Sequence, residues 1–511
     1  MSGEIVDGAT ASLPHELTVD VCIVGSGCGG ATAAWEFARA GREVLVLEEG
    51  ADLTGVKLTQ RDGAMYDQLY MDRGGRSTSD LGISVLQGRV LGGGGVINAS
   101  DVVPISDGVL EHWQARYGLT DFSPAALGPF RMAALADLHA NLPAEEQLNA
   151  NNRLLRRGAQ ALGWAGEVMM HNRVGCAGVG TCLIGCPLDR KKNPRFVAIP
   201  AALEAGARFL TRVRAVKLEG ATAELKVLRA RRLAARGSKE GAALTVRART
   251  VILAANAVAS AQLLLRSGVG NAQVGRNLML QPQHPVVARF ADEVRFFRGI
   301  PQAWALTQFE EPATAQKGWW GFRAEAISGT PGIVASLLPE VGAAGKTLMT
   351  RYAHLAAALV LTPDEGQGTV RVEPSGRLRI DYALTDEQRA RLRAGVKATA
   401  RAYLAAGAEE VLVPSAPAVR VRSEAGLAVL DALSLAPATA PMLSAHQMGT
   451  VRFAPNEKDG GANPDGLVYG TRGVYVFDSS GFPSSASSHI MAPILTTSRY
   501  LSRKLLAALA R

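Results

Sequence analysis

VDVCIVGSGCGGATAAWEFARAGREVLVLEEG, residues Val19–Gly50, is the stretch that decides the fold. An apolar run, Val21–Val24, stops at a glycine-rich turn, and an alanine-rich amphipathic segment follows as far as Arg39. A second apolar run, Glu43–Leu47, ends at Glu48. This order of strand, G-x-G-x-x-G turn, helix, strand and acid is typical of a Rossmann-like dinucleotide-binding unit.

The three glycines of the turn have separate physical roles. Gly25 permits the tight turn, Gly27 lets the backbone approach a pyrophosphate, and Gly30 lets the helix pack closely on the strand. The pyrophosphate is expected at the helix N-terminus, where free N–H groups and the helix dipole favour an anion. Glu48 lies 18 residues past Gly30, about where a carboxylate binds the adenosine ribose. The motif predicts NAD or FAD without distinguishing them; the alternative is a purely structural glycine turn.

A second glycine-rich segment, GRVLGGGGVIN, occupies residues Gly88–Asn98. Its four consecutive glycines stand between apolar residues, without the serines or charges of a flexible linker. Only glycine removes every Cβ from one face of the backbone, so this segment is expected to lie against something planar.

GRVLGGGGVIN resembles the glycine-rich segment of the glucose–methanol–choline (GMC) oxidoreductases, which runs under the isoalloxazine ring of FAD. Together with the N-terminal unit, this resemblance favours FAD over NAD. Some members attach the flavin covalently to a histidine just before the asparagine, and because Ile97 has that place here, a noncovalent FAD is predicted. The cofactor-binding residues implied so far are Gly25, Gly27, Gly30, Glu48, Arg89, Gly92, Gly93, Gly94 and Asn98.

The reactive groups lie near the C-terminus. SAHQMGT, Ser444–Thr450, resembles the H-x-x-G-T of the same family in the version of its long-chain fatty alcohol oxidase and cholesterol oxidase-like branch. VYVFDSSGFP, Val474–Pro483, resembles the family's xVxDxSxxP, which implies that Asp478 contacts the ribityl and phosphate side of FAD. Six residues past that proline the family places an asparagine or a histidine, and His489 has this spacing.

Two such residues suit the oxidation of an alcohol. A base takes the hydroxyl proton as hydride leaves the carbinol carbon for flavin N5, and a neutral imidazole titrating near the working pH suits that task. A second group holds the hydroxyl so that the C–H bond points at the flavin. We therefore predict His446 as the base and His489 as its partner, with the two roles exchangeable. The alternative for each is a structural histidine.

Two further segments match the family pattern in part. VGRNLMLQPQHP, Val274–Pro285, has Gln281 and Pro282 where the family has His-Pro. His284 comes three places late, so the family role is not assigned to it. The position of Val213 is one at which the family uses the backbone to hold adenine, and Val213 is therefore predicted as a cofactor contact.

Three cysteines, Cys176, Cys182 and Cys186, lie in the glycine-rich segment CAGVGTCLIGCP. Their spacing loosely resembles an iron–sulfur run, but no fourth cysteine follows and the next histidine is His284. On this ligand count we predict no metal. The segment and the lysine pair that begins at Lys191 are similar to a loop of the same branch, and the role of the three thiols is left open.

Length, charge and cysteine content exclude several classes of protein. At 511 residues the chain is too long for one core, and its net charge of +9 comes from scattered arginines rather than basic runs, so no nucleic acid partner is predicted. No apolar stretch approaches the roughly 18 residues of a membrane span, and no secretory signal is visible. Five cysteines, an odd number, suit a reducing compartment, so a cytoplasmic location is expected.

We expect an α/β fold, α+β overall. A discontinuous Rossmann-like FAD-binding domain is predicted from residues 15–110, 171–290 and 436–511. Residues 111–170 and 291–435 are predicted to form a substrate-binding region on an antiparallel sheet with helices. Apolar spacing predicts helices at 111–117, 125–139, 149–162 and 386–406, and strands at 318–327 and 368–382.

The predicted function is the FAD-dependent oxidation of an alcohol to an aldehyde or ketone, with oxygen or another electron acceptor. The branch resemblance favours a hydrophobic primary alcohol, long-chain or aryl. The alternatives are a flavin-bearing lyase or photodecarboxylase on the same fold, a sterol or sugar alcohol dehydrogenase, an NAD-dependent dehydrogenase, and a non-catalytic dinucleotide-binding protein. Contact with a membrane surface is left open.

Overall fold

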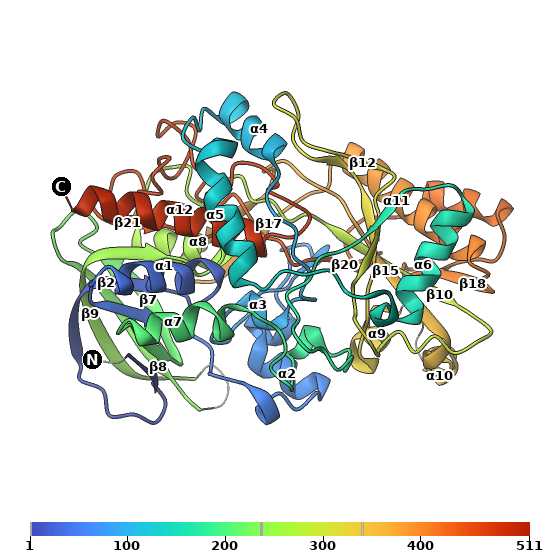
Figure 1. Ribbon diagram of the computed structural model, residues 1–511, viewed down its shortest axis with the longest axis horizontal. Helices are drawn as coiled ribbons and strands as arrows, with labels where there is room; N and C mark the ends of the chain where they lie inside the picture. The colour runs from blue at the N-terminus through green and yellow to red at the C-terminus, as the bar shows by residue number, and fades with distance from the viewer. Residues whose placement is uncertain (1–2, 236–238, 339, 341, 511) are drawn as a thin grey trace.

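Two large sheets organise the chain, as the computed structural model shows (Figure 1). Residues 3–235, 239–338, 340 and 342–510 are described, and Arg511, the last residue of the predicted FAD-binding domain, lies outside them. No helix in these ranges is both long and apolar enough to cross a membrane.

The first sheet has eight strands and grows outward from the N-terminal motif. Its central strands are parallel and buried on both faces, which is why they read as continuous apolar runs in the sequence. In spatial order it contains β1 (Glu4–Asp7), β6 (Arg208–Thr211), β3 (Val44–Leu47), β2 (Glu16–Val24), β9 (Glu240–Leu253), β8 (Lys226–Leu233) and β7 (Val213–Glu219), with β21 (Val474–Val476) beside β9.

Helix α1 (Cys28–Arg39) packs directly on this sheet because the turn before it is made of glycine. A Cβ at Gly30 would lie 1.9 Å from the carbonyl oxygen of Gly25, which no side chain permits. A Cβ at Gly29 would lie 2.0 Å from the carbonyl oxygen of Phe477, where the C-terminal part of the chain crosses. Helix α12 (Met491–Leu509) packs along α1, and the hydroxyl of Ser498 donates to the carbonyl of Gly29 at 2.8 Å. The two ends of the chain therefore meet at the motif.

The second sheet has nine strands, mostly antiparallel. Helices α6 (Ala150–Ala161) and α11 (Asp386–Ala405) pack on it, at the end of the molecule away from α1 and α12 (Figure 1). In spatial order it contains β19 (Val419–Val421), β18 (Glu410–Val413), β10 (Gln283–Arg289), β15 (Leu355–Leu361), β14 (Arg323–Ala326), β11 (Trp304–Leu306) and β5 (Gly166–Val168), while β20 (Met442–Ser444) joins β10 to β4 (Ile83–Val85).

The remaining elements connect and cover the sheets. They are α2 (Asp62–Leu69), α3 (Gly94–Ile97), α4 (Asp107–Tyr117), α5 (Pro124–Asp137), α7 (Ala198–Glu204), α8 (Ala257–Ser267), α9 (Pro331–Leu337) and α10 (Gly342–Thr350), with the pairs β12 (Glu310–Glu311) and β13 (Trp320–Gly321), and β16 (Thr369–Val372) and β17 (Leu378–Asp381).

The α/β fold class is confirmed, and the four predicted helices appear as α4, α5, α6 and α11 with small shifts at their ends. The predicted strand at 318–327 is divided between β13 and β14, because Gly321 has a φ of +78° and breaks the extended conformation. The segment 368–382 is a hairpin of β16 and β17 rather than one strand. Helix α5 packs on α12 and α6 packs on α11, so the segment 111–170 contacts both lobes; the domain boundaries stay a prediction.

The contact at Gly30 yields a test of the fold. We expect Gly30→Ala to lower the melting temperature by several degrees, since its Cβ collides with backbone that cannot move aside. Gly128→Ala in α5 is the matched control: nothing lies within 4 Å of its added Cβ, and alanine is favoured over glycine in a helix by about 1 kcal/mol. Equal melting temperatures for the two variants would contradict this packing.

Candidate active site

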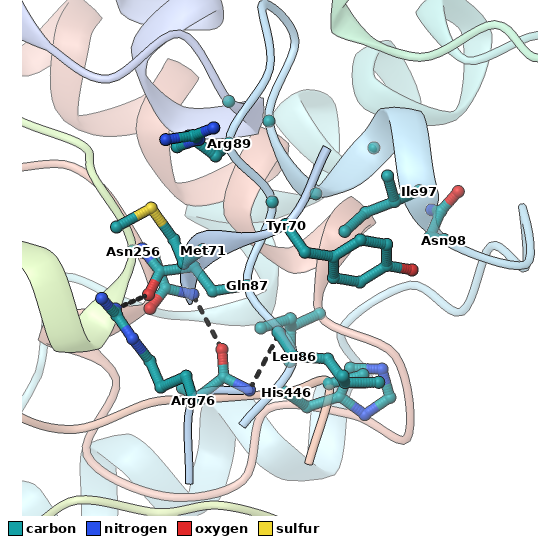
Figure 2. Close-up of a pocket in the computed structure, with 18 of the residues that line it drawn as sticks. Tyr70, Met71, Arg76, Leu86, Gln87, Arg89, Ile97, Asn98, Asn256 and His446 are labelled. Atoms are coloured by element: carbon teal, nitrogen blue, oxygen red, sulfur yellow. Dashed lines mark hydrogen bonds between the residues drawn. The ribbon is translucent and has the colours of Figure 1, made fainter. Parts of the chain in front are cut away.

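A cavity of about 480 Å³ is lined by residues of both sheets. This volume is in the range of sites that bind small molecules and cofactors. Figure 2 shows part of its wall, including Ile97, Asn98 and His446. The cavity reaches from the glycine turn of the first sheet to apolar side chains of β10 and β15 in the second. A ligand bound there would touch both lobes.

Eleven of the thirteen predicted site residues line this one cavity. The two others lie just behind its wall: Gly30 packs on Gly25, and the N–H of Gly92 donates to the Ser26 hydroxyl at 3.0 Å. The residues that line it are Gly25, Gly27, Glu48, Arg89, Gly93, Gly94, Asn98, Val213, His446, Asp478 and His489. The structure thus brings together residues that are more than 460 positions apart in the sequence.

The glycine turn offers free donors to an anion. The N-cap of α1, Gly27, provides no side-chain cap, and the first turn carries no acidic residue. Gly93 of the second glycine segment lies against it, since a Cβ at Gly93 would stand 2.7 Å from the Cα of Gly27. Backbone N–H groups at a helix N-terminus, without competing side chains, fit the pyrophosphate of a dinucleotide.

Two buried carboxylates flank this turn. Glu48 accepts from the hydroxyl of Ser26 at 2.6 Å and from the N–H of Gly50 at 2.7 Å, and its burial raises its pKa. Asp478 accepts from Ser260 Oγ at 2.6 Å and from the N–H of Ser480 at 2.8 Å, and burial raises its pKa as well. Fixed acceptors at both ends of the turn fit the hydroxyl groups of a nucleotide cofactor.

The second glycine segment ends in α3 at Ile97, which lines the cavity with an alkyl side chain (Figure 2). An alkyl group cannot form a covalent bond to a cofactor. The next residue, Asn98, is hydrogen-bonded to the buried ammonium of Lys191. This ammonium donates to the backbone carbonyl of Asn98 at 2.8 Å and to the backbone carbonyl of Cys182 at 3.0 Å. This explains why Lys191 is buried, and burial lowers its pKa to about 8.

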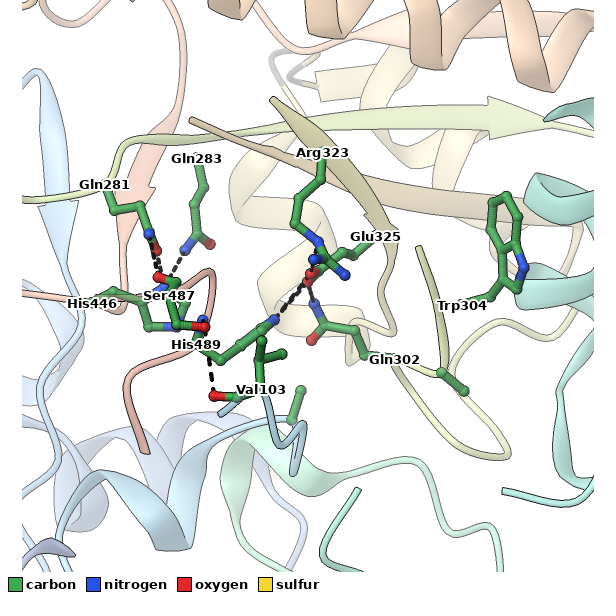
Figure 3. A network of polar contacts seen from close by, with 12 residues as sticks. Val103, Gln281, Gln283, Gln302, Trp304, Arg323, Glu325, His446, Ser487 and His489 are labelled. Carbon is green, nitrogen blue, oxygen red and sulfur yellow. Dashed lines mark hydrogen bonds and ion pairs between the residues drawn. The ribbon is translucent and has the colours of Figure 1, made fainter. Parts of the chain in front are cut away.

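His446 and His489 face each other in the cavity, with ring centroids 5.0 Å apart and planes at 76° (Figure 3). The Nδ1 of His446 is bound by the side-chain carbonyl oxygen of Gln281, whose amide group donates to the Ser487 carbonyl at 2.8 Å. The amide nitrogen of Gln283 lies farther from the same Nδ1, at 3.4 Å, so the closer Gln281 oxygen favours a proton on Nδ1. The Nε2 of His446 is then left with a lone pair, and no described residue occupies it.

His489 is bound to a buried carboxylate instead. Its Nε2 lies 3.0 and 2.9 Å from the two oxygens of Glu325, a residue of β14 with no solvent exposure. Glu325 also pairs with Arg323 Nε at 2.7 Å and accepts from the amide of Gln302 (Figure 3). Figure 3 shows these groups on the side of His489 away from His446.

The two environments consequently shift the pKa values of the histidines in opposite directions. Burial, with the nearby charge of His489, lowers the pKa of His446 to about 3. Burial also acts to lower the pKa of His489, but the charge and hydrogen bonds of Glu325 outweigh it, and this pKa lies above the usual 6.5. Burial acts to raise the pKa of Glu325, yet His489 and Arg323 hold it at about 2. The pairing with Glu325 thus favours the charged form of His489, whereas burial favours the neutral form of His446.

Glu325, Gln281 and Gln302 were not predicted from the sequence. Gln281 stands where the family pattern has a histidine, and this departure was the only signal for it. His284 is buried with Nδ1 against the Pro285 carbonyl at 2.8 Å and does not line the cavity. All five cysteines are free thiols. In the described part of the chain no three histidine, cysteine, aspartate or glutamate side chains are grouped as metal ligands.

The Glu325 ion pairs yield a pH-dependent test. Because the pKa of Glu325 falls from 4.5 to about 2 on folding, its contribution to stability is present above pH 4.5 and is lost as the pH falls toward 2. We expect Glu325→Gln to lower the free energy of unfolding at pH 7 by about 3–5 kcal/mol, the usual cost of breaking a buried ion pair, and by less at pH 3. Urea denaturation at both pH values measures this.

The matched control is Glu311→Gln, which removes a solvent-exposed pair with Lys317 at 2.6 Å. An exposed pair contributes about 0–1 kcal/mol. A Glu325→Gln variant that unfolds like this control at pH 7 would contradict the charge assignment.

Comparison with known proteins agrees with this geometry. Residues 66–283 and 364–498 match two GMC oxidoreductase family models, and residues 23–86 match an NAD(P)-binding Rossmann-like domain. An uncharacterized GMC-type oxidoreductase of Mycobacterium tuberculosis (strain ATCC 25618 / H37Rv) is 33% identical over 483 residues, which cover 93% of this chain and 74% of that protein. A long-chain-alcohol oxidase of Arabidopsis thaliana is 26% identical over 507 residues, covering 96% and 68%.

Solved structures share the fold. Pyridoxine 4-oxidase from Mesorbium loti superposes with a TM-score of 0.70 at 19% identity and covers 95% of this chain and 99% of its own. Formate oxidase superposes with a TM-score of 0.67 at 15% identity, covering 97% and 99%. The sequence relatives, the family models and the fold agree: this chain belongs to the GMC oxidoreductases, a family of flavoproteins, and is an oxidoreductase acting on alcohol-type donors.

Proposed function

We propose that this protein oxidises a hydrophobic primary alcohol, long-chain or aryl, to the aldehyde, using noncovalently bound FAD. The observation that carries the proposal is that two histidines face each other in one cavity with apolar lining, and that only His489 is paired with a buried carboxylate. The electron acceptor is oxygen or another oxidant.

The glycine turn and the two carboxylates would hold the nucleotide part of FAD, and the second glycine segment would lie under its ring system. FAD, when bound, supplies the acceptor for the hydride of the alcohol. The side chain of Ile97 supports noncovalent binding. The proposed cofactor contacts are Gly25, Gly27, Gly30, Glu48, Arg89, Gly92, Gly93, Gly94, Asn98, Val213 and Asp478.

His446 is the proposed base. Gln281 holds the proton on Nδ1, so that the lone pair of Nε2 is available to the substrate hydroxyl. His489 is the proposed positioning and charge-stabilising partner, because its Nε2 is committed to Glu325 while no described residue binds its Nδ1. A positively charged N–H aimed at an oxygen that gains negative charge lowers the barrier to hydride departure. The free Nε2 supports His446 over His489 as the base, although burial holds its pKa at about 3, below the near-neutral value expected from the sequence.

An apolar arm of the cavity supports a hydrophobic substrate. Residues of α9 form part of its lining, and burying alkyl surface there contributes about 25 cal/mol per Å². The relative named as a long-chain-alcohol oxidase supports the same class. The arm is lined by Phe296, Ile327, Ile333, Val334, Leu337, Leu338, Leu359 and Leu361.

The proposal includes the location and the domain division predicted from the sequence. The five free thiols support the proposed location in a reducing cytoplasm. The domain division predicted from the sequence is retained, with the cavity at the junction of the two lobes. A lyase or photodecarboxylase on this fold is distinguished by the first experiment below.

Anaerobic reduction tests the proposed function. We expect the purified protein to be yellow and to bleach when dodecanol or cinnamyl alcohol is added without oxygen, and glucose to have no effect. We expect His446→Ala to slow this reduction by about 10²–10⁴-fold, the usual contribution of a general base. A yellow protein that no alcohol bleaches would contradict alcohol oxidation and favour the lyase alternative.

The apolar arm predicts a change of chain-length preference. Ile333 lines the arm from α9, and Ile333→Trp is expected to lower kcat/KM for dodecanol at least tenfold relative to hexanol, because the indole fills the space of the distal methylenes. Ala335→Trp on the same helix is the control, since Ala335 is exposed and does not line the cavity. Equal losses for both alcohols would show that the substrate does not occupy this arm.

A further inference from the structure

Asp101 is a buried acid in the cavity that the proposed mechanism has not used. It lies three residues past Asn98, is 2% exposed and lines the cavity. Neither oxygen of its carboxyl group has a hydrogen-bond partner among the described residues. Buried polar side chains nearly always have a partner, so a buried acid that faces a cavity without one is available to a ligand or to a proton.

Asp101 lines the same cavity as His446 and His489, and the charge of His489 acts on its carboxyl group. It is paired across an isolated β-bridge with His171, so the two side chains leave the same side of the backbone. His171 is also buried without a described partner, and burial lowers its pKa to about 3, so it is neutral. The charged groups that act on Asp101 come from separate segments and are His489, Arg173, Glu325, Arg323 and Lys191.

The proposed chemistry leaves a proton without a stable site. Oxidation of CH–OH to C=O releases a hydride, which goes to the cofactor, and one proton from the hydroxyl. His446 accepts this proton first, but a buried imidazolium beside the charged His489 is unfavourable, as its low pKa shows. The Nε2 of His489 is occupied by Glu325, and this pairing favours the form of His489 that already has both ring protons. The proton therefore has to move on.

We propose that Asp101 is the final acceptor of the hydroxyl proton: its carboxylate becomes a neutral carboxyl group as the alcohol becomes the carbonyl product. This inference rests on the proposed function. The bonds balance, because the O–H bond of the substrate is lost and an O–H bond on Asp101 is formed, while the hydride reduces the cofactor. No further oxidant or reductant is needed for this step.

The acidity of Asp101 fits this role. Burial raises its pKa to about 7, although the charges of His489 and Arg173 act against this. The group is then a carboxylate above pH 7 and can accept a proton, whereas below pH 7 it is already protonated. Negative charge on a reduced cofactor held in this site would raise the pKa of Asp101 further, and Asp101 would then retain the proton. We expect reduction by alcohol to slow below about pH 7 in the native protein.

The direct test counts protons in one anaerobic turnover. The holoenzyme is mixed with dodecanol at pH 8 in weak buffer with a pH-indicator dye. We expect the native protein to release close to no protons per flavin reduced. Asp101→Asn should release about one proton per flavin. Its rate of reduction by alcohol should no longer fall below pH 7. Asp101→Glu should restore proton retention. Asp137→Asn is the control, because Asp137 is a raised-pKa carboxyl at the end of α5 outside the cavity lining.

A second measurement needs no turnover. Folding raises the pKa of Asp101 from 3.8 to about 7, so between these pH values the native state binds a proton that the unfolded state does not. The free energy of unfolding therefore falls as the pH rises from 4 to 7. The melting temperature of the native protein, relative to Asp101→Asn, should fall over that interval. A constant difference would overturn the assigned acidity.

The outcomes separate the two proposals. If the native protein is reduced by alcohol and Asp101→Asn still retains the proton, the role of Asp101 is wrong and the proposed function stands. If Asp101→Asn changes only the Kd of the substrate, Asp101 binds substrate and is not the proton acceptor. If no alcohol reduces the native protein, the proposed function fails, and the melting experiment still decides whether Asp101 is protonated.

Discussion

Glu325 carries a carboxylate that has no contact with solvent, so its negative charge has to be balanced inside the protein. Arg323 on the same strand supplies one positive charge and His489 supplies the other. Because β14 lies inside the second sheet while His489 precedes α12 beside the first, this ion pair ties the two lobes together at the cavity. The protonation state of His489, and through it that of His446, depends on this pairing.

The first sheet places the other half of the site by close packing. Backbone passes so near to Gly25, Gly29 and Gly93 that only glycine fits, and the resulting turn presents N–H groups instead of side chains. The same contacts bring the C-terminal helix α12 against α1, which carries His489 back to the N-terminal motif. The glycine turn and the pair of histidines thus meet in one cavity.

Much of this could be predicted from the sequence, because its signals are local. Glycine spacing, apolar runs and the acid at Glu48 lie within about 30 residues of each other and report a single supersecondary unit. The histidines were found through motifs that surround them. Glu325 could not be found in this way, since nothing in the strand around it marks a charged partner 164 residues later. Asp101 was missed for the same reason: its importance comes from burial and from a missing partner, neither of which local sequence reports.

The central claim is that the cavity holds one neutral and one charged histidine. Nitrogen NMR of protein labelled at the histidine ring nitrogens tests it directly, with His446→Gln and His489→Gln used to assign the signals. At pH 7 we predict a neutral ring with the proton on Nδ1 for His446, and a doubly protonated ring for His489. Two neutral rings, or the charge on His446, would contradict the account.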